Sequence, residues 1–170
     1  SKHLQFQPTP CRMAFFGHTG SGKSASAAVA WRTLFPLCKR WYIISPTLDQ
    51  DAGFEPLKDQ IVKGLRDQGI SQDDPEENPF FYSLDALPGI IKKAMLLTKQ
   101  SREAGDDSSS QVLLYLDDTA NMGRFSSVLD NLYATSHHVG LNVIQCAQKY
   151  TMMSVYQRQS LSHIAMMNKL

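Results

Sequence analysis

The sequence is poor in cysteine, has no long apolar run and carries no excess of charge of either sign. Its three cysteines, Cys11, Cys38 and Cys146, are far apart and odd in number, so they match neither a zinc-binding spacing nor a disulfide framework. No apolar stretch approaches the length of a membrane span, and no signal peptide opens the chain. These absences predict an intracellular protein in a reducing compartment, with no membrane partner.

The charged residues are nearly balanced, with 17 Lys and Arg against 16 Asp and Glu. This balance excludes a globally basic nucleic-acid binder. A surface for DNA must therefore come from local clusters or from several copies assembled together. The local basic spots are Lys39 with Arg40, Lys92 with Lys93, and Lys149 with Tyr150. Ordinary solvated surface is the simpler interpretation of each pair.

At 170 residues, the chain is expected to form a single domain, residues 1–170. Apolar strand-like runs alternate with helical patterns along it. The expected strands are 12–16, 41–45, 112–118, 141–148 and 163–167, with "FFYSL" (80–84) as a further short candidate. The expected helices are 23–35, 54–67, 85–101 and 125–135. Apolar strands separated by helices predict an α/β fold: a mainly parallel central sheet of about five strands, flanked by helices on both faces.

The stretch GHTGSGKS at residues 17–24 fits the phosphate-binding pattern G-x-x-x-x-G-K-[ST]. Its glycines let backbone N–H groups converge on phosphates, and the following helix adds the positive end of its dipole. We expect Lys23 to reach the β- and γ-phosphates and Ser24 to hold Mg²⁺. The predicted nucleotide-binding residues are Gly17, His18, Thr19, Gly20, Ser21, Gly22, Lys23 and Ser24.

A second motif, VLLYLDD at residues 112–118, is an apolar run that ends in two carboxylates. In open α/β sheets such a strand delivers its last residues to the edge where ligands bind. We expect Asp117 to hold Mg²⁺, directly or through water, and Asp118 to orient or deprotonate the attacking water. A carboxylate directly after the Mg²⁺ aspartate favours hydrolysis over kinase-type transfer. The alternative is that the pair merely caps the following segment.

The apolar run 141–148 ends in Gln-Cys-Ala-Gln. In motor NTPases a polar residue at this edge lies beside the γ-phosphate and senses its loss. Gln148 is the predicted sensor because the strand runs out there, and Gln145 is the alternate. An ordinary surface glutamine is the competing interpretation of either residue.

Together, GHTGSGKS, LLYLDD and the block SHHVGLNVIQCAQKY…RQSLSH resemble the genome-packaging ATPases of large double-stranded DNA viruses. These belong to the FtsK–HerA group of DNA-pumping ATPases, and poxviruses carry typical members. In that family a strand rich in Ile and Val follows a His, ends in Gln-Lys-Tyr, and precedes an Arg with a polar residue two positions on. Here these elements are His138, residues 148–150, and Arg158 with Ser160. The resemblance spans about residues 13–167.

The resemblance implies an ATPase of the ASCE type of P-loop fold that uses ATP and Mg²⁺. The strand carrying Asp117 would lie two places from the phosphate-loop strand, with the strand of Gln148 between them. It also implies a homo-oligomeric ring of five or six subunits that pushes double-stranded DNA, independent of sequence, into a preformed capsid. Its partners would be the DNA and a capsid or portal protein, in the cytoplasm or nucleus of a host cell or in the virion.

A ring motor of this kind needs an arginine from a neighbouring subunit to neutralise charge in the transition state. The family commonly has an arginine where this chain has His137, so Arg124 and Arg158 are the candidates here. Arg124 follows DDTANMG, close to the active edge, and Arg158 lies beyond the sensor strand. For each of them, an ordinary surface salt bridge is the alternative.

Two other readings of the sequence remain open. A related P-loop motor could act on other cargo, as a helicase or as an assembly ATPase that exports single-stranded DNA. A nucleotide-gated scaffold would bind ATP with negligible hydrolysis, although Asp118 argues against it. The sequence has no Asn/Thr-Lys-x-Asp guanine-reading motif, which favours ATP over GTP.

Overall fold

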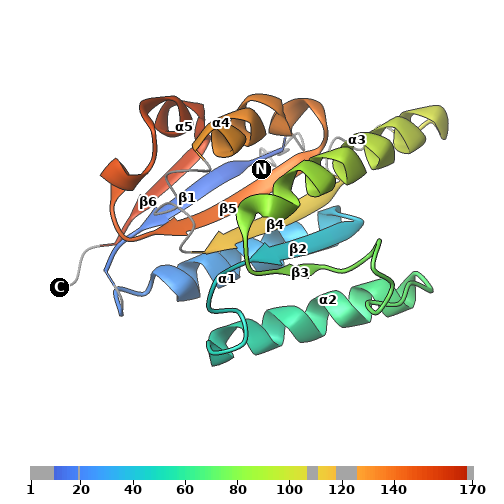
Figure 1. Ribbon diagram of the computed structural model, residues 1–170, viewed down its shortest axis with the longest axis horizontal. Helices are drawn as coiled ribbons and strands as arrows, with labels where there is room; N and C mark the ends of the chain where they lie inside the picture. Colours follow the sequence, from blue (N-terminus) through green and yellow to red (C-terminus); the bar gives the residue numbers. More distant parts are fainter. Residues whose placement is uncertain (1–9, 19, 107–110, 118–125, 168–170) are drawn as a thin grey trace, which may run out of the picture.

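The computed structural model describes residues 10–18, 20–106, 111–117 and 126–167. These residues form a six-stranded sheet in the order β3-β2-β4-β5-β1-β6, and every pairing in it is parallel (Figure 1). The strands are β1 (Arg12–Phe16), β2 (Arg40–Ile44), β3 (Phe80–Phe81), β4 (Val112–Asp117), β5 (Leu141–Ala147) and β6 (His163–Met166). The helices are α1 (Lys23–Leu34), α2 (Glu55–Asp67), α3 (Leu87–Glu103), α4 (Ser126–Thr135) and α5 (Val155–Ser160).

The predicted fold class and strand order are confirmed. Strand β4 lies two places from β1, and β5 lies between them. The sheet has one strand more than the expected five, because "FFYSL" contributes β3, which pairs with β2 through only two residues. Helix α3 starts at Leu87 and accommodates Pro88 in its first turn, where the missing N–H leaves no helical hydrogen bond unmade.

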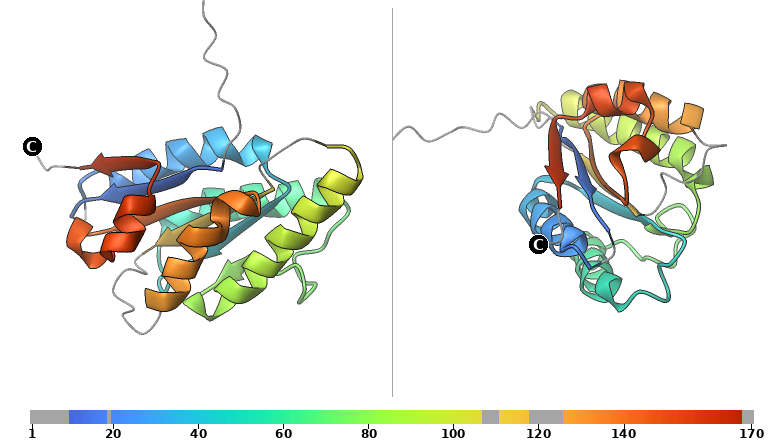
Figure 2. Two further views of the ribbon diagram at one scale, coloured as in Figure 1. Left: turned by 90° about the horizontal axis from the view of Figure 1, so that it is seen from above. Right: turned by 90° about the vertical axis from the view of Figure 1, so that its left-hand side faces the viewer.

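Helices cover both faces of the sheet, with α1 and α2 on one side and α3, α4 and α5 on the other (Figures 1 and 2). Successive side chains of a strand point to opposite faces, so each strand must be apolar throughout to fill both layers. Strand β4 meets this requirement, with buried residues from Val112 to Leu116.

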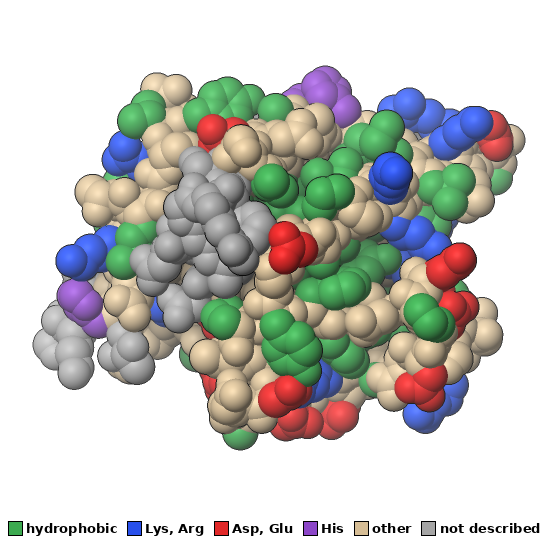
Figure 3. Space-filling view, in the orientation of Figure 1, with side chains coloured by type: hydrophobic (Ala, Val, Ile, Leu, Met, Phe, Trp, Pro, Cys, Tyr) green, Lys and Arg blue, Asp and Glu red, His purple; other side chains and the backbone are tan. Residues whose placement is uncertain are grey.

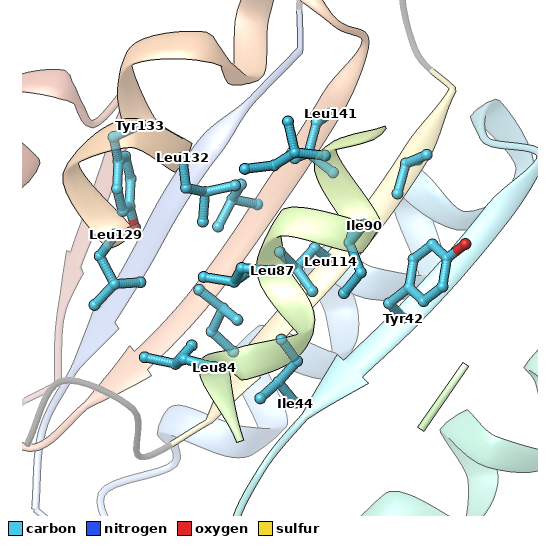
Figure 4. Close-up of a cluster of buried hydrophobic side chains, with 14 of the residues drawn as sticks. Tyr42, Ile44, Leu84, Leu87, Ile90, Leu114, Leu129, Leu132, Tyr133 and Leu141 are labelled. Atoms are coloured by element: carbon cyan, nitrogen blue, oxygen red, sulfur yellow. The ribbon is translucent and has the colours of Figure 1, made fainter. Parts of the chain in front are cut away.

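The layer on the α3 and α4 side is built from alternate residues of β2, β4 and β5. Figure 4 shows Leu114 and Ile44 of the sheet packed beneath Leu87 and Ile90 of α3, with Leu132 of α4 beside them. In the opposite layer, Trp31 of α1 is fully buried, and its indole N–H donates to Oε1 of Gln60 in α2 at 3.0 Å. An apolar cluster thus covers each face of the sheet.

An apolar groove of about 620 Å³ opens between α3 and β3, on the face shown in Figure 3. Tyr42, Phe81 and Ile90 line its floor. Beside it, Glu77 accepts hydrogen bonds from Arg40 Nε at 2.9 Å and Lys93 Nζ at 2.7 Å. None of the residues that line this groove lines the cavity at the phosphate loop. Within the described part of the chain, no helix is long and apolar enough to cross a membrane.

Candidate nucleotide-binding site

The phosphate loop leaves the carboxyl end of β1 and returns as the first turn of α1. The Gly17 N–H donates to the Ala147 carbonyl at 3.2 Å, and the Ser21 N–H donates to the His18 carbonyl at 3.0 Å. Gly20 and Gly22 have φ angles of 79° and 88°, a left-handed conformation that side-chain-bearing residues rarely adopt. The glycines therefore allow a tight loop that turns backbone N–H groups into the start of a helix.

Gly17 is needed for a second reason, which is close packing. A Cβ atom placed on it would lie 2.8 Å from the Met167 carbonyl oxygen and would also overlap the Ser21 hydroxyl. The Met167 backbone is itself fixed, because its N–H donates to the Phe16 carbonyl at 2.7 Å. A larger residue at position 17 would therefore displace the backbone that follows β6.

A cavity of about 350 Å³ opens over this loop, within the size range of small-molecule sites. Its lining residues are His18, Gly20, Gly22, Lys23, Ser24, Ala25, Asp51, Asp117 and Gln148. One ammonium group, a hydroxyl and two carboxylates thus face a single space at the start of α1. This set of groups fits a nucleotide phosphate chain with a hard divalent cation, because such a cation takes oxygen ligands and Lys binds phosphate as a point charge.

The structure brings together most of the predicted site residues that it describes. Lys23, Ser24, Asp117 and Gln148 share the cavity. Gly17 and Ser21 shape the loop beside it. The predicted residues Thr19, Asp118 and Arg124 lie outside the described residues.

Ser45 and Asp51 also belong to the site, although the sequence did not single them out. The Ser45 hydroxyl donates to Oδ2 of Asp117 at 3.2 Å. Asp51 lines the cavity, and its Oδ1 accepts from the Gly53 N–H at 2.9 Å. The one sequence signal for Ser45 is its place between the apolar run of β2 and Pro46, at the same edge as the other strand ends.

Gln145 of β5 and Gln148, which follows the end of β5, lie on different sides of the sheet. Gln148 is exposed and lines the cavity. Gln145 is fully buried, and its Oε1 accepts a hydrogen bond from the Tyr133 hydroxyl of α4. Because the side chain of Gln145 is buried in the core on the α4 side, Gln148 remains the sensor candidate.

Arg158 is held by contacts within its own chain. Its guanidinium carbon lies 4.8 Å from the centre of the Tyr150 ring, a cation–π distance. Tyr150 in turn packs edge-on against Phe16, with ring centres 5.3 Å apart. Arg158 does not line the cavity.

His137 lies before the amino end of β5, at the opposite edge of the sheet from the cavity. Loss of solvation, together with the positive charges of His138 and Arg12, lowers the pKa of His137. Its neutral ring can therefore accept from Arg12, whose Nη1 lies 3.0 Å from Nδ1 of His137. The histidine rings are 3.7 Å apart, centre to centre.

Beside Asp117, two buried side chains of β4 and β5 are uncharged. The Tyr115 hydroxyl of β4 lies 3.3 Å from the Cys146 sulfur of β5. Burial raises the pKa of the Cys146 thiol to about 12, and burial also raises the pKa of Tyr115. Both groups stay protonated at neutral pH, so neither adds negative charge near a site suited to phosphates.

Comparisons with known proteins agree with this geometry. The sequence matches the family described as Poxvirus A32 protein over residues 2–170. No curated protein matches the chain.

Among solved structures, the cytoplasmic domain of EssC has a TM-score of 0.57 at 15% identity, covering 92% of this chain and 32% of its own. EssC (ATPases 2 and 3) from Geobacillus thermodenitrificans has a TM-score of 0.56 at 17% identity, with the same coverage of 92% and 32%. The chain thus spans about a third of each structure's length, and the likeness concerns the fold. The P-loop fold and the phosphate loop agree with the family match, and the chain belongs to the poxvirus A32 protein family.

Proposed function

We propose that this chain hydrolyses ATP in the presence of Mg²⁺ to move double-stranded DNA, in the packaging of a viral genome into a preformed capsid. The observation that carries the proposal is the cavity in which Lys23, Ser24, Asp117 and Gln148 meet over a fitted glycine loop. Membership of the A32 family supports viral DNA packaging as the use of that site.

In this proposal each residue of the cavity has a distinct task. The loop N–H groups and Lys23 hold the β- and γ-phosphates. Ser24 and Asp117 are the ligands for Mg²⁺, which when bound would neutralise phosphate charge. Asp118 orients or deprotonates the attacking water, and Gln148 lies where the terminal phosphate is held, so its contacts change when that phosphate leaves.

We further propose that the chain acts as a homo-oligomeric ring with an arginine supplied in trans. Arg124 and Arg158 are the candidates from the sequence, and Arg12 joins them because it contacts His137, where the family commonly has an arginine. Alanine at the true trans residue should reduce turnover by about 10³-fold or more while sparing ATP affinity. If Arg12→Ala, Arg124→Ala and Arg158→Ala all retain turnover, the trans arginine is not among them.

DNA contact is expected to involve the phosphate backbone and to depend on assembly, since the net charge is only +1. Packaging would also require docking to a capsid or portal protein inside the host cell or virion. A helicase or single-stranded DNA exporter is the alternative motor, and a nucleotide-gated scaffold is the alternative outside the motors. Stimulation by duplex or by single-stranded DNA distinguishes the packaging motor from a helicase or exporter. Hydrolysis itself distinguishes both motors from the scaffold.

The test is steady-state ATP hydrolysis with and without long duplex DNA, alongside Asp118→Asn. Its matched control is Asp59→Asn on the exposed side of α2, which removes the same charge away from the site. We expect strong stimulation by duplex, a loss of about 10²–10⁴-fold in Asp118→Asn, and no change in the control. Hydrolysis indifferent to duplex would contradict DNA as the cargo, and stimulation by single strands alone would favour the helicase or exporter. Tight ATP binding without hydrolysis would favour the scaffold.

A further inference from the structure

The side chain of Ser45 contacts Asp117, a residue that lines the nucleotide cavity. Parallel pairing aligns Ile44 of β2 with Leu116 of β4, so the next residues along, Ser45 and Asp117, lie side by side at the end of the sheet. Ser45 is 0% exposed. Its hydroxyl is 3.2 Å from Oδ2 of Asp117. A buried donor thus contacts the carboxylate from the protein side, while that carboxylate also lines the cavity.

The hydrogen bonds around Ser45 leave only one direction for its proton. A serine hydroxyl has one proton to donate and two lone pairs that accept. The Thr47 N–H donates to Oγ of Ser45 at 3.2 Å. The Thr47 hydroxyl lies 3.2 Å from the same oxygen. A carboxylate can only accept, so the Ser45 proton goes to Asp117 and the Thr47 hydroxyl fills the second lone pair.

The backbone keeps this hydroxyl in place. The Ser45 N–H donates to the Phe81 carbonyl of β3 at 3.0 Å. Because Ser45 precedes Pro46, its own backbone is biased to the extended conformation. On the far side, the Thr47 carbonyl accepts from the N–H of Asp51 at 3.0 Å, and Asp51 lines the cavity. The short strand β3 therefore has a role at the site, because it fixes the residue that contacts Asp117.

We propose that Ser45, with Thr47 behind it, is a positioning residue that holds the Asp117 carboxylate in the orientation needed to bind Mg²⁺. Partners that hydrogen-bond to metal-ligating carboxylates orient them, and their removal costs about 10–100-fold in metal affinity or activity. Ser45 itself touches neither metal nor nucleotide. The inference rests on the proposed Mg²⁺–nucleotide site, and its test separates the two.

The experiment measures binding of a non-hydrolysable fluorescent ATP analogue during a Mg²⁺ titration and in excess chelator. The variants are Ser45→Ala and Thr47→Val, the second of which keeps the side-chain shape and lies at an exposed position. The matched control is Ser136→Ala. Ser136 is also 0% exposed, and its hydroxyl has no hydrogen-bond partner among the described residues.

In Ser45→Ala we expect about 10-fold more Mg²⁺ to be needed for half-maximal enhancement of binding, with affinity in chelator unchanged. Thr47→Val should require about 3-fold more, and Ser136→Ala should match the wild type. Equal loss of affinity with and without Mg²⁺ would mean a merely structural role and would overturn the proposal. An unchanged Mg²⁺ requirement in both Ser45→Ala and Thr47→Val would also overturn it. If Ser45→Ala does not fold, Thr47→Val decides alone. A wild type that binds the analogue without any Mg²⁺ enhancement would overturn the proposed site together with this inference.

Discussion

A glycine in the middle of α2 gives the sharpest test of how this fold is packed. A Cβ atom on Gly64 would lie 2.7 Å from Cζ3 and 2.9 Å from Cη2 of Trp41, and 3.2 Å from Cζ of Phe35. Neither ring is free to yield. They stack with centres 4.2 Å apart and planes 8° apart, and the Trp41 indole N–H donates to the Phe35 carbonyl at 2.9 Å. Gly64→Ala must therefore displace a fixed aromatic pair.

The expected magnitude follows from two opposing effects. Alanine in a helix interior is favoured over glycine by about 1 kcal/mol. Overpacking of a fitted core costs about 1–3 kcal/mol, and disturbing the aromatic stack adds about 0.5–1.5 kcal/mol. We expect the clash to win, with a net loss of about 0.5–3.5 kcal/mol in the free energy of unfolding.

Urea unfolding followed by tryptophan fluorescence measures this difference, and Gly89→Ala is the matched control. Gly89 lies in the first turn of α3, and a Cβ atom there would meet nothing within 4 Å. The control should gain up to about 0.5 kcal/mol. If Gly64→Ala is as stable as the wild type or more so, the packing of α2 against Trp41 described here is wrong.

Further predictions concern the pH dependence of stability, the reactivity of the thiols and the nucleotide site. The contribution of Cys38 and Cys146 to stability should be constant up to about pH 9 and then fall by about 1.4 kcal/mol per pH unit for each of them. Burial raises both pKa values from 9.0 to about 12, so above pH 9 only the unfolded chain releases these protons; urea melts up to about pH 11 measure the loss. In native protein, the half-buried Cys11 should react with a thiol reagent well before the two buried cysteines, as mass spectrometry of labelled peptides would show. Lys23→Ala should weaken ATP binding by about 10–100-fold through loss of a charged contact, as measured by calorimetry. Gln148→Ala should lower turnover with little change in that affinity.

The sequence was sufficient for those parts of the site that lie in consecutive residues. The phosphate loop, its lysine and the aspartate at the end of β4 each belong to a short motif whose residue types are dictated by phosphate and cation chemistry. The order of β4, β5 and β1 was predicted from the family resemblance, and it is confirmed. Helix α2 was expected from apolar residues at helical spacing, and Leu57, Ile61 and Leu65 are its buried residues.

The parts that could not be predicted depend on contacts between distant segments. The bounds of β3 are one such part: only two residues of the candidate strand 80–84 pair with β2, too few for a periodic pattern to define them. The sequence favours Gln148 over Gln145 only by its place at the end of the apolar run, whereas the hydrogen bond that buries Gln145 against Tyr133 is visible only in the structure. Residues such as Asp51 reach the cavity from a loop with no motif of its own.

Parallel register explains why the site forms at all. In β2, β4, β5 and β1, side chains at aligned positions share one face, and the carboxyl ends meet at one edge. Asp117 is aligned with Cys146, and Cys146 with Phe15, while Ser45 follows the pair Ile44 and Leu116. If β2 shifted by one residue along β4, the apolar residues of both strands would still be buried, because β4 is buried on both faces. Ser45 would, however, no longer lie beside Asp117. Burial alone thus does not specify this register. The hydrogen bond from Ser45 to Asp117 does favour it, which makes the positioning of one carboxylate part of what aligns the sheet.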